Sequence, residues 1–499
     1  MNDIFKKTMK ASNSNIIDTF LNPKSVAVIG ASKNLGKGGN WIVNNLVTNR
    51  YNGKVYPINP NATGKLYGLE FKKSVLDIKE DVDLAIFYIP NRGIPELLND
   101  CIKKGIKGAI IEASGFEEVG EKGLELRDQI LEITNNFSKI RVLGPNCMGI
   151  SRIDGDSISE NKGGFFSGFG TFQEYKRGNI AVISQSGMLN GGYLMHIMSK
   201  YPEMGFRYSV SVGNKMDLSE VEFLEYFLED PTVNVIAIYL ESFKYPRKFI
   251  DLCKKAKNIQ DKTIIMVKGG LTKQGQKASL SHTGTLSEDT KLIKAIMNQA
   301  GIIQARDFDE LFQFARTFSM LYSAGKTLPK HGNISLVAGS GGAGTILSDI
   351  TMHYGLKYPL LGDKAYKSLE NIFPEWMPPN RFAFVDIWPA MEKGMRTNMS
   401  RWEVIQIAID AVLSEPEVEG LFNMLFCRKG ITDTMDFDKY AESLNKSSKP
   451  VFLWLVGQNK EVRRITRILN KNNIPNFPNL ENMVKNFWIL VQESKNKRI

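Results

Sequence analysis

Short apolar segments alternate with helical stretches along the whole chain, and this alternation restricts the fold more than any other feature of the sequence. The first series runs from about Asn22 to Ser151 and contains the expected strands SVAVIG, KVYPIN, LAIFYIP, GAIIEA and RVLGPN. Short β-branched runs separated by helices are typical of parallel sheets that carry helices on both faces. We therefore predict an α/β protein built from doubly wound parallel sheets.

Two later series echo each other. One opens with GNIAVISQSG at Gly178 and the other with GNISLVAGSGGAG at Gly332. In both, Gly-Asn-Ile begins an expected strand, and a Ser-Gly pair follows eight residues later, at Ser186 and at Ser340. Residues 327–332 (TLPKHG) separate the two series as a linker. We predict two similar α/β units, each with a Gly-rich strand-to-helix turn.

Length and composition are those of a folded protein. The chain has 499 residues, which suits about three domains, with 42% hydrophobic and 23% charged residues. Disordered and collagen-like classes are therefore excluded. The formal charge of +11 comes from Lys and Arg residues spread along the chain. Because no nucleic-acid-binding motif is present, we interpret this charge as a solvated lysine-rich surface.

Cysteine spacing and hydropathy bear on the compartment. Cys101, Cys147, Cys253 and Cys427 lie far apart and form no CxxC pair, so we expect neither a disulfide scaffold nor a metal site. The N-terminal residues lack the apolar core of a signal peptide. No apolar run reaches the roughly 18–20 residues that span a bilayer. These features favour a cytoplasmic protein.

The first Gly-rich turn does not have the spacing of a nicotinamide site. Its glycines are Gly30, Gly36, Gly38 and Gly39, which do not form GxGxxG, and the next strand ends in PINPN, without an acidic residue for a ribose. An NAD-dependent oxidoreductase is therefore disfavoured. A different phosphate-bearing adenine ligand and a tight turn without any ligand both remain open.

One of the four histidines differs from the others. His196 and His353 lie in helical stretches and His331 in the linker, where packing or solvent exposure explains them. His282 lies in SLSHTGTLSED, residues 279–289, which we expect to be a polar loop before a helix. This loop offers few ligands for a metal, and SQSG lacks the GxSxG pattern of a serine hydrolase.

A histidine can also accept a phosphoryl group. That chemistry needs one free ring nitrogen, a carboxylate or carbonyl that holds the other, and groups that stabilise the anionic adduct. Glu241, at the end of the expected strand VIAIYL, is a candidate for holding the ring. The SQSG and GSGGAG turns are candidates for stabilising the adduct, because helix N-termini bind phosphate.

The motifs VAVIGAS, GPNCMG, AVISQSG, GNKMDLSE, YLESF and SHTGTL together resemble those of the NDP-forming acyl-CoA synthetases, relatives of succinyl-CoA synthetase. The resemblance is greatest to the alpha subunits of ADP-forming acetate–CoA ligases. It implies a Rossmann-like CoA-binding domain at residues 16–151, a flavodoxin-like ligase domain at 177–326 that carries a phosphohistidine, and a second flavodoxin-like ligase domain at 332–490.

The same resemblance assigns roles to residues. His282 would be the transient phosphohistidine and Glu241 the carboxylate that orients it. The phosphate-binding helix N-termini would be Ser184, Gln185, Ser186 and Gly187, and Gly341, Gly342, Ala343 and Gly344. The CoA site would comprise Gly30, Ser32, Gly36, Lys37, Asn59, Pro60, Ile89, Pro90, Phe116, Glu118 and Asn146, with Phe116 and Glu118 near the thioester.

The implied activity is that of an acid–CoA ligase, which interconverts acyl-CoA, ADP and phosphate with a carboxylic acid, CoA and ATP. The sequence has no GxxxxGK[ST] loop, so ATP or ADP and Mg²⁺ are expected on an ATP-grasp beta-type partner subunit in a hetero-oligomer. The alternative is a non-catalytic regulatory protein that senses CoA or acyl-CoA.

Three segments depart from the family pattern. Residues 383–386 read Ala-Phe-Val-Asp where the family has Asn-Pro-Val-Asp, and residues 268–272 read Lys-Gly-Gly-Leu-Thr where it has Lys-x-Gly-Arg-Ser. The segment GFFSGFGTFQEY adds aromatic residues, and we expect no regular element in it. These changes favour an acid bulkier than acetate, or they are drift at packing positions.

Overall fold

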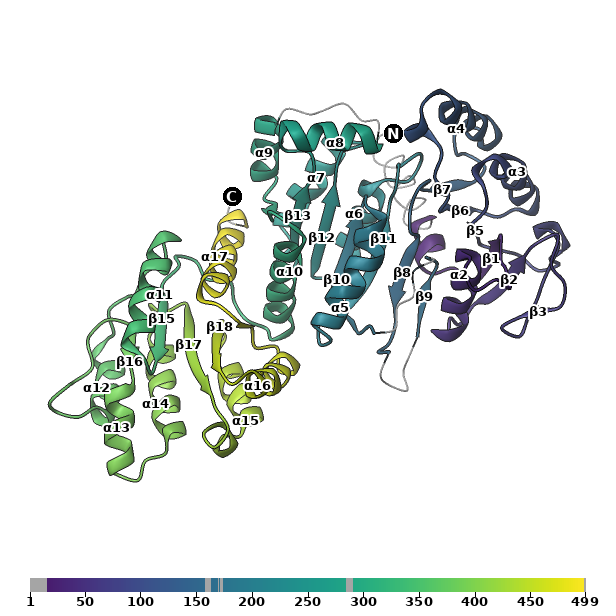
Figure 1. Cartoon of the computed structure of the whole chain (residues 1–499). Coiled ribbons are helices and arrows are strands. Elements are labelled where there is room, and N and C mark those ends of the chain that lie inside the picture. Colours follow the sequence, from purple (N-terminus) through teal and green to yellow (C-terminus); the bar gives the residue numbers. More distant parts are fainter. Residues whose placement is uncertain (1–15, 158–162, 169, 171–173, 284–289, 498–499) are drawn as a thin grey trace. The chain divides into compact units, whose positions relative to one another are not determined.

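The computed structural model describes residues 16–157, 163–168, 170, 174–283 and 290–497, with the side chains of 279–283 outside this description. The chain divides into a first unit, Met1–Ala315, and a second unit, Arg316–Ile499. The described residues form two parallel-type sheets in the first unit and one in the second, each with helices around it (Figure 1).

The first sheet has the order β2-β1-β5-β6-β7, and all its strands are parallel. Its strands are β1 (Ser25–Ile29), β2 (Lys54–Ile58), β5 (Leu84–Phe87), β6 (Gly108–Ile111) and β7 (Arg141–Leu143). Its helices are α2 (Gly38–Thr48), α3 (Ile94–Lys104) and α4 (Glu121–Thr134). A short hairpin, β3 (Lys65–Leu66) and β4 (Leu69–Glu70), and the 3-10 helices Val75–Asp77, Asn91–Gly93 and Glu117–Val119 complete it.

Alternating side chains of this sheet face two separate cores, as the two-residue period of a strand requires. One set packs with α2: Val26, Val28, Leu84, Ile86 and Ile110. The other packs with α3 and α4: Ala27, Ile29, Ala85, Phe87, Ala109 and Ile111. Burial on both faces explains why each strand reads as a continuous apolar run, and it confirms the doubly wound sheet.

The second sheet has the order β14-β13-β12-β10-β11-β8-β9. Five strands are parallel: β10 (Arg177–Ser184), β11 (Phe206–Ser211), β12 (Val235–Leu240), β13 (Thr263–Lys268) and β14 (Ile303–Gln304). β8 (Ile150–Ile153) and β9 (Gly164–Phe166) extend one edge antiparallel. The helices are a π-helical turn, Leu189–Tyr193, that leads into α5 (Leu194–Lys200), then α6 (Glu220–Glu229), α7 (Pro246–Lys257), α8 (Lys273–Thr283), α9 (Thr290–Gln299) and α10 (Phe308–Ser323).

The third sheet, in the second unit, is parallel and has the order β16-β15-β17-β18-β19. Its strands are β15 (Ile334–Ala338), β16 (Phe384–Asp386), β17 (Gly420–Cys427), β18 (Val451–Gly457) and β19 (Asn476–Phe477). Its helices are α11 (Gly341–His353), α12 (Asp363–Ile372), α13 (Trp388–Arg396), α14 (Arg401–Ser414), α15 (Phe437–Asn445), α16 (Asn459–Lys471) and α17 (Leu480–Asn496), with a 3-10 turn at Thr432–Thr434.

The sequence echo corresponds to matching local structure. Ser186 accepts a hydrogen bond from the Leu189 N–H at 3.5 Å, and Ser340 accepts one from the Ala343 N–H at 3.3 Å. Each serine therefore caps the helix that follows the first parallel strand of its sheet. In both sheets this first parallel strand lies next to the point where strand order reverses, which is where ligands of open α/β sheets bind.

Two local expectations were wrong. Residues 164–166 form β9, because Phe165 packs on Tyr51 at 5.3 Å and Phe166 packs on Tyr175 at 5.0 Å, and this burial orders the segment. The expected loop at 279–289 begins as helix, since α8 runs to Thr283. The Thr272 hydroxyl accepts the Gly275 N–H at 3.0 Å and so starts this helix.

The division into domains at 151, 177, 326 and 332 stays a prediction. Residue 151 falls within β8, which belongs to the second sheet. A continuous apolar core also joins α2 of the first sheet to β10 and β11 of the second, through Ile42, Phe165, Ala181 and Val210. None of the described helices is long and apolar enough to cross a membrane.

Candidate functional site

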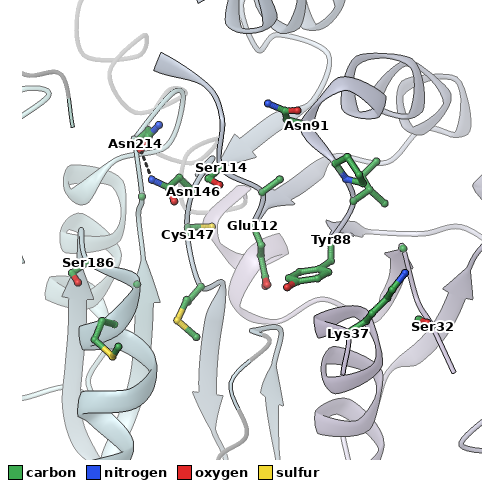
Figure 2. A pocket seen from close by; sticks show the side chains of 18 of the residues that line it. Ser32, Lys37, Tyr88, Asn91, Glu112, Ser114, Asn146, Cys147, Ser186 and Asn214 are labelled. Atoms are coloured by element: carbon green, nitrogen blue, oxygen red, sulfur yellow. Dashed lines mark hydrogen bonds between the residues drawn. The ribbon is translucent and has the colours of Figure 1, made fainter. Parts of the chain in front are cut away.

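A cavity of about 1190 Å³ opens where the strands of the first and second sheets end. Loops after β1, β2, β5, β6 and β7 line it on one side, and loops after β10 and β11 line it on the other. Figure 2 shows Ser32 and Lys37 at one side of this cavity and Ser186 at the other, with Glu112 and Cys147 between them.

The turn after β1 brings the backbone close to the cavity. Gly30 has φ +94°, and a methyl group built on it would lie 2.2 Å from the Tyr88 carbonyl oxygen. The Ser32 hydroxyl accepts the Asn34 N–H at 3.1 Å, and the Asn34 side chain accepts the Gly36 N–H at 2.8 Å. The turn is thus shaped by its own side chains, and only glycine fits at its first position.

Helix α2 begins directly after this turn. Its N-cap residue, Lys37, makes no side-chain cap, and its first turn contains no acidic residue. A methyl group on Gly38 would lie 2.4 Å from the Tyr88 ring, and one on Gly39 would lie 2.1 Å from the Gly30 carbonyl oxygen. The uncapped N-terminus and the Lys37 ammonium together suit the phosphates of an anionic ligand.

Amide side chains hold the middle of the cavity. Asn146, at φ +55°, donates to the Asn214 side-chain oxygen at 3.3 Å, a bond drawn in Figure 2. Asn214 in turn donates to the Glu118 carboxylate at 2.5 Å, and that carboxylate also accepts the Gly115 N–H at 2.6 Å. Glu118 is therefore tied to the cavity wall through Asn214. The loop after β6 and the loop after β11 are connected in this way.

At the other end, the turn after β10 presents a helix N-terminus. Gln185, Ser186 and Gly187 line the cavity, and Ser186 caps the helix. The buried Ser184 hydroxyl donates to the Ser186 carbonyl at 2.8 Å and accepts the Ser186 N–H at 3.1 Å. These bonds fix the turn, and a helix N-terminus of this kind suits a phosphate.

Glu241 lies beside this turn. The Gln185 side-chain oxygen accepts the backbone N–H of Glu241 at 2.9 Å, and the Glu241 carboxylate accepts the Tyr239 hydroxyl at 3.1 Å. Burial, with the nearby Glu241 charge, raises the pKa of Tyr239, so the phenol stays a donor. Lys268 donates to the Glu241 carbonyl at 2.7 Å. These hydrogen bonds fix the position of Glu241 directly after β12.

His282 belongs to the last turn of α8, and its side chain lies outside the described part of the structure. The backbone of α8 packs against the 3-10 helix Glu117–Val119, which carries Glu118. The helix with the histidine is therefore next to the loop that Asn214 connects to the cavity.

Most of the expected CoA residues lie together. Those that line the cavity are Gly30, Ser32, Gly36, Lys37, Asn59, Ile89, Pro90 and Asn146. Pro60 is exposed outside it, Glu118 reaches it through Asn214, and Phe116 is fully buried in the core of the first sheet. The other expected phosphate turn, Gly341–Gly344, forms the first turn of α11 in the second unit.

Sequence reasoning missed other residues that line the cavity. They are Tyr88, Asn91, Glu112, Ala113, Ser114, Cys147, Met148, Met188, Gly192, Gly213 and Asn214. Most belong to the loops YIPN, IEAS, GPNCM and VGN at strand ends. Their position directly after an expected strand was a usable signal, because carboxyl ends of parallel strands meet at one edge.

Comparison with known proteins identifies the family to which the chain belongs. Residues 24–152 match the model of the CoA binding domain, and residues 177–318 match that of the succinyl-CoA ligase like flavodoxin domain. The alpha subunit of ADP-forming acetate–CoA ligase I from Pyrococcus furiosus is 33% identical over 96% of this chain and 98% of its own length. The chain belongs to the family of ADP-forming acid–CoA ligases.

Other members of this family agree with the fold. ADP-forming acetate–CoA ligase II from Archaeoglobus fulgidus is 36% identical over 93% of this chain, which spans 64% of that relative's length. The structure of the dinucleotide-forming acetyl-coenzyme A synthetase 1 of Ca. Korarchaeum cryptofilum, in complex with phosphate and ADP, has a TM-score of 0.81 at 29% identity and 97% coverage of each chain. The predicted family and the Rossmann-like and flavodoxin-like fold are confirmed.

Proposed function

We propose that this chain is the alpha-type subunit of an ADP-forming acid–CoA ligase that relays phosphate through His282. The observation that carries the proposal is the single cavity that joins the Lys37 turn to the Ser186 turn within the first unit. One end suits the phosphates of CoA and the other suits inorganic phosphate. A sensor that binds CoA without turnover has no support among the relatives, which are named as ligases.

The reaction has three steps. Phosphate attacks the thioester carbonyl of acyl-CoA, the carbon–sulfur bond breaks, and acyl phosphate and CoA form. A ring nitrogen of His282 then attacks the phosphorus and releases the carboxylate. The phosphoryl group finally passes from His282 to ADP, which becomes ATP. A covalent relay of this kind divides one difficult transfer between two sites.

The residues of this chain act by position and charge. The N-terminus of α2 and Lys37 bind the phosphates of CoA, and Asn146 and Asn214 hold the pantetheine end. The capped turn at Ser186 binds the attacking phosphate, with the turn at Gly341–Gly344 as the second cradle for the adduct. Glu241, fixed through Gln185, orients the imidazole so that one ring nitrogen stays free.

The nucleotide and Mg²⁺ are proposed to bind a partner subunit of the ATP-grasp type, in a cytoplasmic hetero-oligomer. Alpha subunits are named as such among the relatives, which supports a partner chain. The purified chain alone is therefore expected to form no ATP from acyl-CoA, ADP and phosphate. Robust ADP phosphorylation without a second protein would overturn this part of the proposal.

Radiolabelled phosphate tests the relay directly. The chain, with a candidate ATP-grasp partner, is incubated with labelled phosphate and a panel of acyl-CoAs that includes acetyl, succinyl and phenylacetyl thioesters. We expect acid-labile, alkali-stable label on the wild type and none on His282→Asn. Label that persists on His282→Asn, or no label with any thioester while CoA still binds, would refute the relay. The relative rates would also show whether the acid is bulkier than acetate.

A further inference from the structure

At the end of the cavity next to the Ser186 turn, the side chain of Met148 packs against several glycines. Met148 follows β7, lies partly buried, and lines the cavity together with Met188, Gly187 and Gly192. It lies between the amide pair at Asn146 and the turn at Ser186. No role for it was expected from the sequence.

Glycines surround the Met148 side chain. A methyl group built on Gly191 would lie 2.6 Å from its Cε and 2.8 Å from its Sδ. A methyl group on Gly187 would lie 3.0 Å from its Cγ, and one on Gly170 would lie 3.2 Å from its Cε. The Met148 side chain therefore fills space that three absent side chains leave open.

The glycine segment is held in place from the first sheet. The buried Asn45 side chain of α2 donates to the carbonyls of Gly168 at 2.9 Å and Gly170 at 2.7 Å. Gly191 lies in the π-helical turn Leu189–Tyr193. The backbone at Gly170, Gly187 and Gly191 thus lies behind the side chain of Met148. This side chain is long and unbranched, and it has three rotatable bonds. Met148 is therefore the side chain against this backbone that can change the room at this end of the cavity.

The acyl group has to lie at this end, an argument that rests on the function proposed above. Phosphate at the Ser186 turn must reach the thioester carbonyl, so the acyl tail points toward Met148 and Met188. Among the described residues that line the cavity, Lys37 is the one cation, and it belongs to the opposite side (Figure 2). The lining near Met148 and Met188 therefore supplies two apolar thioether side chains and no cation that could pair a second carboxylate.

We propose that Met148 determines the length of the acyl chain that this subunit accepts, and that Gly191 determines how far Met148 can retract. The two positions should have opposite effects. Met148→Ala leaves an open space next to these glycines, so that a longer acyl chain fits. Gly191→Ala pushes the Met148 thioether into the cavity and so leaves less room for the acyl chain. Alanine is favourable within a helix, so the variant should keep its fold.

Binding of S-alkyl thioethers of CoA tests this without turnover. The ratio of dissociation constants for S-hexyl-CoA and S-ethyl-CoA is measured by calorimetry on wild type, Met148→Ala, Gly191→Ala and the volume-conserving control Met148→Leu. We expect the ratio to fall about tenfold in Met148→Ala and to rise about tenfold in Gly191→Ala. A change of this size is typical when one or two methylene groups gain or lose their place in a pocket. Met148→Leu should stay close to wild type.

Affinity for free CoA separates the acyl end from the rest of the site, because free CoA has no acyl group to contact Met148. An unchanged free-CoA affinity with opposite shifts in the two ratios supports the assignment. Unchanged ratios in both variants, or shifts of the same sign, overturn it. Because these ligands are not turned over, the phosphate-labelling experiment decides the proposed relay separately from this result.

Discussion

Lys215 is expected to be a residue on which both stability and the proposed chemistry depend. Its side chain is 4% exposed, and its ammonium lies 3.5 Å from the fully buried Glu220 carboxylate. The ammonium also donates to the Ser242 carbonyl at 2.6 Å and to the Gln185 side-chain oxygen at 3.3 Å. That same Gln185 oxygen accepts the Glu241 N–H. Lys215 therefore supports the residue that positions Glu241.

Lys215→Met keeps the length of the side chain and removes its charge. Glu220 would then be a buried carboxylate without its cation, which costs about 3–5 kcal/mol. For a unit of this size the loss corresponds to a fall of roughly 5–10 °C in the unfolding temperature of the first unit. The double variant Lys215→Met with Glu220→Gln should recover most of it, because glutamine can still accept the Lys244 N–H that Glu220 accepts at 3.0 Å.

Differential scanning calorimetry of wild type, the single variant and the double variant measures these changes. Phosphohistidine labelling of the same proteins tests the positioning role, and we expect it to stay low in the double variant, where Gln185 still lacks its cation. Two results would refute the reasoning. One is a single variant no less stable than the double variant, and the other is full labelling in a variant that lacks Lys215.

Three other predictions concern the turns and one buried lysine. Gly38→Ala should weaken CoA binding about tenfold by calorimetry, because its methyl group meets the Tyr88 ring, whereas Gly163→Ala, with its nearest neighbour at 4.0 Å, should not. Ser186→Ala should lower the stability of the first unit by about 1 kcal/mol and slow phosphate labelling, since it removes a helix cap; unchanged values of both would contradict this. Burial lowers the pKa of Lys326 to about 8 from 10.5, so between these values the unfolded state binds more protons than the folded state. Stability relative to Lys326→Met should therefore rise as pH increases through that window, and unfolding temperatures at about pH 7.5 and about pH 10 check this against a pH-independent difference.

Local patterns in the sequence were enough to predict the architecture. The strand at SVAVIG and its glycine turn are encoded within about fifteen residues, because the apolar run and the turn residues are adjacent. The Gly-Asn-Ile echo predicted two similar strand-to-helix turns, and in each of them a serine, Ser186 or Ser340, accepts a backbone N–H of the helix that follows. Cavity-lining residues such as Lys37 and Asn59 were predicted from the family motifs.

Features that depend on distant contacts could not be predicted from the sequence. The segment at Phe165 has the composition of a loop and becomes a strand only through packing on Tyr51, more than a hundred residues away. Lys215 looks like any lysine of a polar motif, and its burial follows from Ser242 and Glu220, which come from other elements. The role proposed for Met148 could not be predicted either, since it depends on glycines from two other segments.

The five parallel strands of each sheet share one order, in which the first parallel strand lies beside the strand that follows the reversal. Each sheet therefore has its glycine turn at the equivalent position. Two such turns, those after β1 and β10, line one cavity, as the proposed transfer between CoA and phosphate requires. The core that runs from Ile42 to Val210, with β9 packed on α2, joins the first two turns into one unit. Packing within the first unit thus sets the spacing between the proposed CoA and phosphate ends of the cavity, and fixed spacing of this kind favours attack on a bound thioester.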